Sequence, residues 1–279
     1  MKEKIRVGIA QIHSILGNVE KNLEKHLEFI RMAREKNVEL LVFPELSLTG
    51  YLLKDIAYEI SDEATIALEK IRDLTESMCV VVGLVREKRY GIYENSVAYI
   101  CNREIVGYYS KLYLPNYGLF EESRYFKEGD VEDVKVFKWD GWKIGSIICE
   151  DAWHPEPAEL VSRLGADVVV VHSASPIRGL YNRGDTVLER IWESIIVTRA
   201  VENSSYVIFA NSVGPEDEEF FWGGSMIVAP DGEILARGKK MEEDLVVADL
   251  DIFLLRSARR FSSYKIHRKD IHDLLSLLG

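Results

Sequence analysis

The chain has 279 residues, 47% hydrophobic and 29% charged, a composition typical of a soluble globular protein with one large core. Its 46 acidic and 35 basic residues give a formal net charge of −11, which argues against a nucleic-acid-binding surface. No apolar run approaches the length of a membrane span, and the N-terminal residues read directly into a strand rather than a signal peptide. We therefore expect a cytoplasmic protein with neither a nucleic-acid nor a membrane partner.

The cysteines favour the same compartment. Cys79, Cys101 and Cys149 lie far apart in the sequence and show no CxxC spacing. This pattern argues against a disulfide framework or a zinc site and favours a reducing environment. Cys79 and Cys101 lie inside β-like runs, so we expect both to be ordinary core residues.

The first half of the chain alternates strands and helices. Residues 5–12 alternate with a period of two and predict a strand. The next segment, 18–38, predicts a helix with an apolar stripe made of Leu23, Leu27, Ile30 and Ala33. The other elements expected here are a short strand in 39–45, a helix over 62–78, a strand over 79–85, and a hairpin of strands 95–101 and 104–114.

The second half repeats this order of elements. Asp140-Gly141 and Asp231-Gly232 are turn signals, each between two strand-like runs. The other elements expected are helices around 156–164 and 184–203, strands in 166–175, 205–214 and 242–251, and a tail (252–279) that is helical only at its end. Alternation implies helices on both strand faces, and hairpins imply mixed sheets, so we expect an α/β fold with two sheets between helical layers.

Three ionisable residues lie at or near the ends of apolar strand-like runs. Glu45 ends "LLVFPE", Lys111 ends "IVGYYSK" and Cys149 ends "IGSIIC". Ligands bind beyond the carboxyl ends of strands in α/β sheets, so these residues are candidates for one site. A thiol nucleophile, a carboxylate base and a lysine that stabilises an oxyanion support acyl transfer through a thioester, with the N–H of Glu150 as a second oxyanion donor.

Each residue also has a purely structural interpretation. Taken singly, Cys149 is more typical of a small core residue, Glu45 of a strand terminator, and Lys111 of a surface residue with a buried stem. Two chemical alternatives are a metal site formed by Cys149, Asp151 and His154, and a dyad of Cys149 with His154 or His172. The coincidence of three strand-end residues favours the thioester hypothesis over these alternatives.

Four segments in register resemble the nitrilase, or carbon–nitrogen hydrolase, superfamily. They are "FPELSLTGY", "SKLYLPNYGLFEESRYFKEGD", "GSIICEDAWHPE" and "HSASP". Within the superfamily, "LPNYGLFEESRYF", "ICEDAW" and "SASP" are most similar to the glutaminase domain of glutamine-dependent NAD synthetases. The resemblance implies a four-layer α-β-β-α sandwich that forms dimers or larger homo-oligomers, and it implies neither a metal nor an organic cofactor.

The resemblance also implies roles for individual residues. The general base is Glu45, the oxyanion lysine is Lys111 and the nucleophile is Cys149. A second catalytic glutamate falls at Glu122, with Glu121 as the alternative. Tyr117, Glu150 and Ser175 are expected to line the substrate site.

Two features separate the chain from complete NAD synthetases. It contains no SGGxDS-type pyrophosphate-binding loop, so we expect no synthetase activity from it. The basic residue that follows "SASP" in glutaminase domains has two candidates, Arg178 and Arg183. We expect a hydrolase domain over 1–250 and, over 251–279, a C-terminal arm that packs on a partner subunit.

The expected function is that of an amidase that cleaves a small-molecule, non-peptide amide to a carboxylic acid and ammonia or an amine. The alternative is a glutaminase subunit that supplies ammonia to an NAD-synthetase-like partner. Phe220, Phe221 and Trp222 are expected either to cap the substrate pocket or to form an exposed loop at an oligomer interface. A binding protein that kept the fold is disfavoured by the intact Glu45, Lys111 and Cys149.

Overall fold

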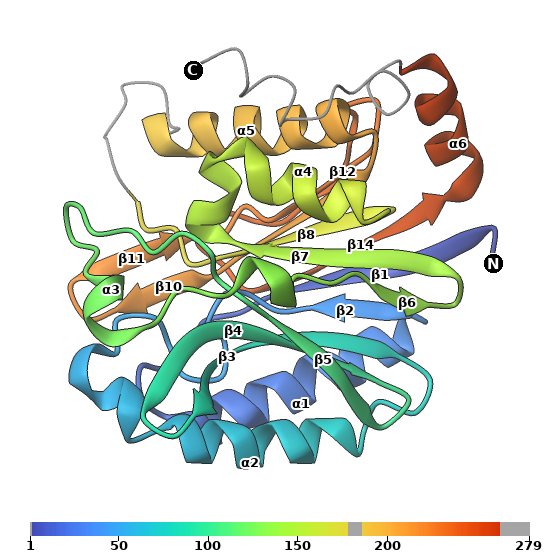
Figure 1. Ribbon diagram of the computed structural model, residues 1–279. Coiled ribbons are helices and arrows are strands. Elements are labelled where there is room, and N and C mark those ends of the chain that lie inside the picture. Colours follow the sequence, from blue (N-terminus) through green and yellow to red (C-terminus); the bar gives the residue numbers. More distant parts are fainter. Residues whose placement is uncertain (1, 178–185, 263–279) are drawn as a thin grey trace.

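The computed structural model describes residues 2–177 and 186–262 (Figure 1). One of its two large sheets has the strand order β14-β1-β2-β3-β4-β5, with β1, β2 and β3 parallel to one another. Helices α1 (Val19–Glu35) and α2 (Ser61–Arg72) cover its outer face. Its strands are β1 (Lys4–Gln11), β2 (Leu40–Val42), β3 (Cys79–Arg89), β4 (Ile92–Cys101), β5 (Glu104–Ser110) and β14 (Asp244–Asp251).

The second large sheet has the order β13-β12-β9-β8-β7-β6, with β7, β8 and β9 parallel. Helices α4 (Pro155–Arg163) and α5 (Val187–Asn203) cover its outer face, on the side opposite α1 and α2 (Figure 1). Its strands are β6 (Phe137–Trp139), β7 (Trp142–Ile148), β8 (Val168–Ser173), β9 (Tyr206–Asn211), β12 (Met226–Val228) and β13 (Ile234–Arg237).

Short elements connect the layers. A separate hairpin consists of β10 (Val213–Glu216) and β11 (Glu219–Trp222). The chain ends its described part in helix α6 (Ile252–Phe261). The remaining short helices are η1 (Lys54–Tyr58), α3 (Glu122–Tyr125), η2 (Val131–Asp133) and η3 (Cys149–Trp153).

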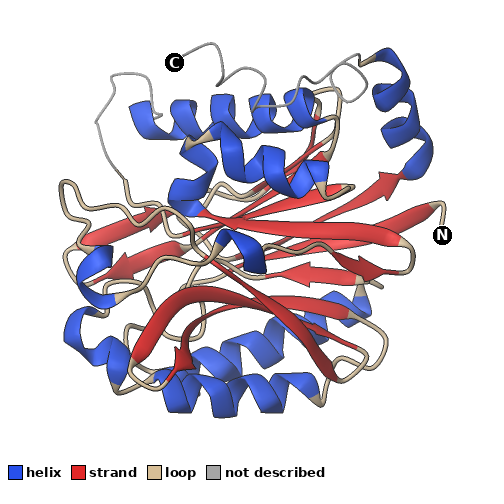
Figure 2. Cartoon of the chain, in the orientation of Figure 1, coloured by secondary structure: helices blue, strands red, loops and turns tan. Residues whose placement is uncertain are grey.

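Helices and strands together form four layers, α-β-β-α, as Figure 2 shows by colour. The inner faces of the two sheets share one core, in which the Tyr99 ring of β4 lies 4.1 Å from the Phe137 ring of β6. The outer faces are also buried, because the helices turn apolar stripes toward them: α1 buries Leu23, Ile30 and Ala33. The predicted fold class, a layered α/β sandwich with mixed sheets, is confirmed.

Some predicted boundaries are wrong. Helix α2 ends at Arg72 instead of continuing to residue 78, because Asp73, Leu74 and Thr75 form a turn that leads into β3. The tail is helical at its beginning, in α6, whose Ile252 and Leu255 are buried in the core. Arg259 of α6 also binds Asp167 of the same chain, with 2.6 Å between Nη1 and Oδ1. Residues 263–279 lie outside the described part, so an arm that packs on a partner subunit stays a prediction.

Cys79 and Cys101 are core residues, as expected, but the expectation that they form no disulfide is wrong. The two are directly opposite each other in the antiparallel β3–β4 pair and form a disulfide. Their separation of 22 residues gave no sign of this, because the strand register decides which residues face each other. Among the described residues, no helix is long and apolar enough to span a membrane.

Candidate active site

The three strand-end residues converge between the two sheets. Glu45 follows β2 by three residues, Lys111 directly follows β5, and Cys149 directly follows β7. All three are buried, with exposed fractions of 1%, 1% and 8%. Their positions at strand ends agree with the sequence-based expectation, and the contacts described below show how Glu45 and Lys111 meet.

A glycine on the neighbouring strand lets the Glu45 turn pack closely. A Cβ atom added to Gly83 of β3 would lie 2.4 Å from the carbonyl oxygen of Pro44 and 2.5 Å from the nitrogen of Leu46. Leu46 itself has a left-handed φ of 48°, which turns the chain sharply after the glutamate. This close backbone approach fixes the direction in which the Glu45 side chain leaves the turn.

Lys111 lies between two carboxylates. Its Nζ is 2.7 Å from Glu45 Oε1 and 2.6 Å from Glu122 Oε1. Burial opposes the lysine's charge, but the fields of Glu122 and Glu45 outweigh it and raise the Lys111 pKa well above its ordinary value. The lysine is therefore a permanent buried cation at neutral pH.

The structure distinguishes the two candidate second glutamates. Glu122 is 5% exposed and, besides Lys111, accepts a hydrogen bond of 2.5 Å from the Tyr51 hydroxyl. Burial raises the pKa of Glu122 to about 7, with Lys111 opposing and Glu45 adding to the shift. Glu121 instead points to the surface, where its side chain is 64% exposed and pairs with Arg124.

Two contacts that the sequence analysis missed orient Glu45. Asn95 donates from Nδ2 to Glu45 Oε1 over 2.8 Å, and the N–H of Ala174 donates to Oε2 over 2.9 Å. Within the described residues, Asn95 Oδ1 and Glu122 Oε2 are buried without a hydrogen-bond partner. The signal for Asn95 was a polar residue at the start of the apolar run "NSVAYIC".

Cys149 begins η3 with a left-handed φ of 46°, a strained conformation for a residue with a side chain. Its sulfur accepts a hydrogen bond of 3.6 Å from the Ser173 hydroxyl of β8. Burial and the Glu45 carboxylate raise the Cys149 pKa well above its ordinary value, although Lys111 and Ser173 oppose the shift. The resting group is thus a neutral thiol, which must lose its proton as it reacts.

Asp151, two residues after the thiol, joins the Cys149 turn to the Lys111 segment. Its Oδ2 accepts hydrogen bonds from the N–H of Ile148 (2.9 Å) and the Tyr109 hydroxyl (2.8 Å). Its Oδ1 accepts from the N–H groups of Leu112 (3.0 Å) and Tyr113 (2.8 Å). One fully buried carboxylate therefore fixes the two chain segments that carry the nucleophile and the cation.

The order of these motifs agrees with a match of the carbon–nitrogen hydrolase family to residues 6–260. The chain belongs to the carbon–nitrogen hydrolase family. It is 38% identical over 256 residues to the glutamine-dependent NAD(+) synthetase of Thermotoga maritima, a match that covers 90% of this chain and 42% of that protein. The chain thus spans less than half the length of this relative.

Other similarities cover whole proteins. The chain is 29% identical over 263 residues to a nitrilase of Pyrococcus abyssi, covering 91% of this chain and 93% of that one. A crystal structure of a carbon–nitrogen hydrolase from Helicobacter pylori G27 has a TM-score of 0.87 at 24% identity and covers 99% of both chains. This last likeness supports the fold of the hydrolase.

The other predicted site residues of this carbon–nitrogen hydrolase have hydrogen-bond partners of their own. The Tyr117 hydroxyl, on a residue that is 52% exposed, donates to Glu150 Oε2 over 2.7 Å, and His154 lies 3.6 Å from Glu150 Oε1. Ser175 is buried, and its hydroxyl accepts the indole N–H of Trp192 over 2.8 Å. Arg178 and Arg183 lie outside the described residues.

The alternative chemistries find less support in the hydrolase. His172 uses one ring nitrogen on the carbonyl oxygen of Phe43 (2.7 Å) and the other on the Ser146 hydroxyl (2.9 Å). Burial lowers its pKa to about 4, so it is neutral and engaged away from Cys149. Asp151 already accepts four hydrogen bonds, and the His154 ring stacks on Tyr113 with 3.9 Å between centroids. The described residues contain no cluster of three or more His, Cys, Asp or Glu side chains arranged for a metal ion.

The segment that contains Phe220, Phe221 and Trp222 is strand β11, which pairs with β10 in an antiparallel hairpin. Phe221 and Trp222 are buried, with exposed fractions of 2% and 1%, which disagrees with an exposed interface loop at these two positions. The Phe221 ring meets the Tyr51 ring edge-on, with 6.2 Å between centroids. The hairpin therefore contacts a residue that binds Glu122.

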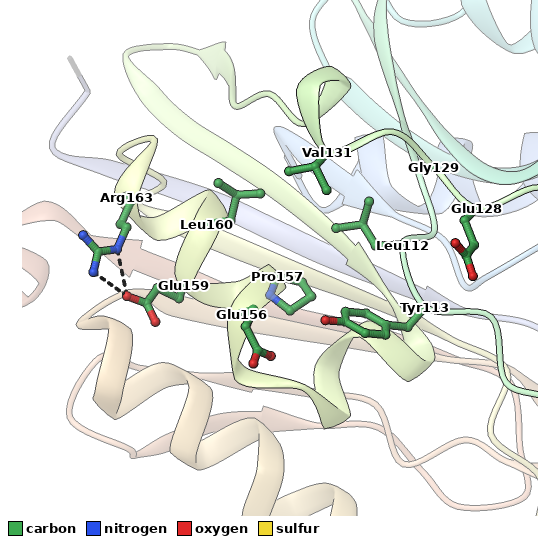
Figure 3. A pocket seen from close by; sticks show the side chains of 10 residues that line it. All are labelled: Leu112, Tyr113, Glu128, Gly129, Val131, Glu156, Pro157, Glu159, Leu160 and Arg163. Carbon is green, nitrogen blue, oxygen red and sulfur yellow. Dashed lines mark hydrogen bonds and ion pairs between the residues drawn. The ribbon is translucent and has the colours of Figure 1, made fainter. Parts of the chain in front are cut away.

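A separate apolar pocket of about 450 Å³ lies between α4 and the segment after Lys111 (Figure 3). It contains none of Glu45, Lys111, Glu122 and Cys149. In Figure 3, Glu159 and Arg163 of α4 form an ion pair at one end of the pocket, with 2.7 Å between Oε1 and Nη2. The buried Glu45–Lys111–Cys149 region, where ionisable groups converge, remains the candidate site.

Proposed function

We propose that this protein is an amidase that cleaves a small, non-peptide amide to a carboxylic acid and ammonia or an amine. The observation that carries the proposal is the buried Lys111 cation, held by Glu45 and Glu122 beside the Cys149 thiol. A buried ion pair of this kind contributes little net stability, so its presence beside a thiol on a strained backbone points to chemistry.

The first half of the reaction forms a thioester. Cys149 sulfur attacks the amide carbonyl carbon as Glu45 takes the thiol proton, so a C–S bond forms and the carbonyl oxygen becomes negative. Lys111 and the N–H of Glu150 stabilise this oxyanion. The C–N bond then breaks, and the amine leaves with the proton that Glu45 returns. Glu122 Oε2, which is buried without a partner among the described residues, supports the proposal as an acceptor for the substrate amide N–H.

The second half hydrolyses the thioester. Water attacks the thioester carbonyl carbon as Glu45 takes one of its protons, and Lys111 again stabilises the oxyanion. The C–S bond breaks, the carboxylic acid leaves, and the sulfur takes the proton back from Glu45. The enzyme returns to its resting state with water as its second substrate and without a redox partner.

A second candidate, within the same chemistry, is a glutaminase that supplies ammonia to an NAD-synthetase-like partner. The Tyr117–Glu150 pair favours it, because a carboxylate at the exposed side of the site would attract the ammonium group of an amino-acid amide. The 38% identity to a protein named glutamine-dependent NAD(+) synthetase also favours it.

Ammonia release from a panel of compounds tests the proposal. The panel contains glutamine, asparagine, short aliphatic amides, N-carbamoyl amino acids, ω-amides of dicarboxylic acids and simple nitriles, each with wild type and Cys149→Ala. We expect release from at least one amide and its loss in the variant. Glutamine as the best substrate, with further stimulation by an added NAD synthetase domain, would support the second candidate. Release that persists in Cys149→Ala, or no release from any amide, would contradict the amidase proposal.

A further inference from the structure

Glu216, at the end of β10, is a buried carboxylate that the mechanism above does not use. It is 5% exposed and lies opposite Glu219 in the β10–β11 hairpin. Burial raises its pKa to about 7, with the hydrogen bonds from Leu52 and Tyr51 opposing the shift. Two other carboxylates are nearby, Glu45 and Asp217, and Asp217 pairs with Lys54. Both are acidic, so neither stabilises a negative charge on Glu216. A carboxyl group in this environment needs a structural or functional reason.

The hydrogen bonds of Glu216 go to a single turn of the chain. Its Oε1 accepts the N–H of Tyr51 over 2.7 Å and also the N–H of Leu52. Gly50, with φ of +81°, allows this approach, since a Cβ atom there would lie 3.1 Å from Glu216 Oε2 and 2.8 Å from the Cα of Leu16. The carboxylate therefore holds the backbone on which the Tyr51 side chain stands.

Tyr51 carries this restraint into the catalytic site. Its hydroxyl donates to Glu122 Oε1 over 2.5 Å, and Lys111 Nζ lies 5.9 Å from the centroid of its ring. The hairpin restrains the same tyrosine a second time, since Phe221 of β11 meets its ring edge-on. Backbone and ring are thus both fixed by one hairpin, more than 160 residues further along the chain.

We propose that Glu216 is a positioning residue for the amidase reaction, which acts through Tyr51 on the orientation of Glu122. This inference rests on the proposed function and adds to it a residue outside the catalytic group. The acceptor oxygen of Glu216 sets the Tyr51 backbone, the tyrosine hydroxyl sets Glu122 Oε1, and Glu122 Oε2 is left directed at the substrate amide. The same hairpin also binds the segment after Ser175, through the N–H of Ile177 to the carbonyl oxygen of Phe220 (2.8 Å).

A double-mutant cycle tests the route through Tyr51. We expect Glu216→Ala to lower kcat at least about tenfold on the best amide, and Tyr51→Phe to lower it by a similar factor. If Glu216 acts through Tyr51, adding Glu216→Ala to Tyr51→Phe should cost less than about threefold more. Independent, multiplying losses would overturn the proposal, as would a normal kcat for Glu216→Ala.

Conservative variants of Glu216 show whether its hydrogen-bond acceptor or its negative charge is needed. Glu216→Gln keeps an oxygen at the same reach and is expected to retain kcat within about threefold. Glu216→Asp keeps the charge but is one methylene shorter, and is expected to lose at least about fivefold. An equal loss of kcat in Glu216→Gln and Glu216→Ala would overturn the role assigned to the hydrogen bonds of Glu216. If Glu216→Ala does not fold, the comparison of Glu216→Gln with Glu216→Asp still tests the proposal. Glu219→Ala, in the same hairpin, is the matched control and is expected to leave kcat unchanged.

A second readout does not depend on amide turnover. The rate at which iodoacetamide alkylates Cys149, followed by mass spectrometry, reports the geometry of the site directly. An inactive wild type whose Cys149 alkylation still slows in Glu216→Ala and Tyr51→Phe, but not in Glu219→Ala, would reject the amidase proposal while supporting the positioning role. If wild type hydrolyses an amide and all variants keep the wild-type kcat and alkylation rate, the amidase proposal is supported and the positioning role of Glu216 is rejected.

Discussion

Lys111 Nζ and Glu122 Oε1 lie 2.6 Å apart, with the lysine side chain 0% and the glutamate side chain 6% exposed. Glu45 takes the other side of the same ammonium group, so the cation is shared by two buried carboxylates. The intact pair adds little net stability, but removing only the lysine would leave two buried anions without a counter-charge, which is strongly destabilising.

We therefore expect Lys111→Met to lower kcat by about 10²–10³, the usual cost of losing an oxyanion donor. We also expect a loss of about 3 kcal/mol in the free energy of unfolding, because a buried pair is broken. Steady-state kinetics and urea unfolding measure the two effects. A Lys111→Met variant with near-normal turnover would exclude the oxyanion role.

Glu122 should control the acidic side of the pH profile. Burial raises its pKa to about 7, and its ionised form is the one that accepts hydrogen bonds from Lys111 and Tyr51 and, in the proposed mechanism, from the substrate. Activity should then fall as pH decreases below about 7, approaching tenfold per pH unit. In Glu122→Gln we expect low activity without this acidic limb, and in the surface control Glu121→Gln an unchanged profile. An unaltered acidic limb in Glu122→Gln would assign it to another group.

Asp151 should make stability depend on pH. Burial raises its pKa from 3.8 to about 6, so between these values the folded state binds more protons than the unfolded state. Its contribution to the free energy of unfolding therefore increases as pH falls from 6 to 4, by up to about 3 kcal/mol at 1.4 kcal/mol per pKa unit. The free energy of unfolding is measured for wild type and Asp151→Asn between pH 4 and 6. As the pH falls, the free energy of unfolding of wild type should rise relative to that of the variant. Parallel curves would contradict the buried-acid assignment.

Gly83 should be intolerant of any side chain. A Cβ atom there would meet backbone atoms of the Glu45 turn at 2.4 and 2.5 Å, which cannot rotate away. We expect Gly83→Ala to lower stability by about 3 kcal/mol and to reduce kcat by displacing Glu45. Gly91→Ala is the matched comparison, because it meets nothing within 4 Å and should cost only about 1 kcal/mol for its left-handed φ. Equal effects of the two substitutions would argue against the close approach.

Local patterns were sufficient for most of the fold. The apolar stripe of α1, the alternation in β1 and the turn residues Asp140-Gly141 each have a period or a backbone preference that can be read without neighbours. Boundaries that depend on packing were less accurate: α2 ends at Arg72 because the chain must turn into β3, and α6 forms because the core accepts Ile252 and Leu255. Helix propensity in the tail did not contain that information.

The sequence by itself determined which residue types stand at three strand ends, because the apolar runs that precede Glu45, Lys111 and Cys149 are continuous in the chain. Only the tertiary structure decided that Glu122 rather than Glu121 reaches Lys111 and that Cys79 faces Cys101. It also decided the hydrogen bonds of Asn95, Tyr51, Asp151 and Glu216 around the candidate site. The physical reason is that hydrogen bonds, ion pairs and disulfides depend on distances of a few ångströms. Residues up to 165 positions apart reach those distances only through strand register and layer packing.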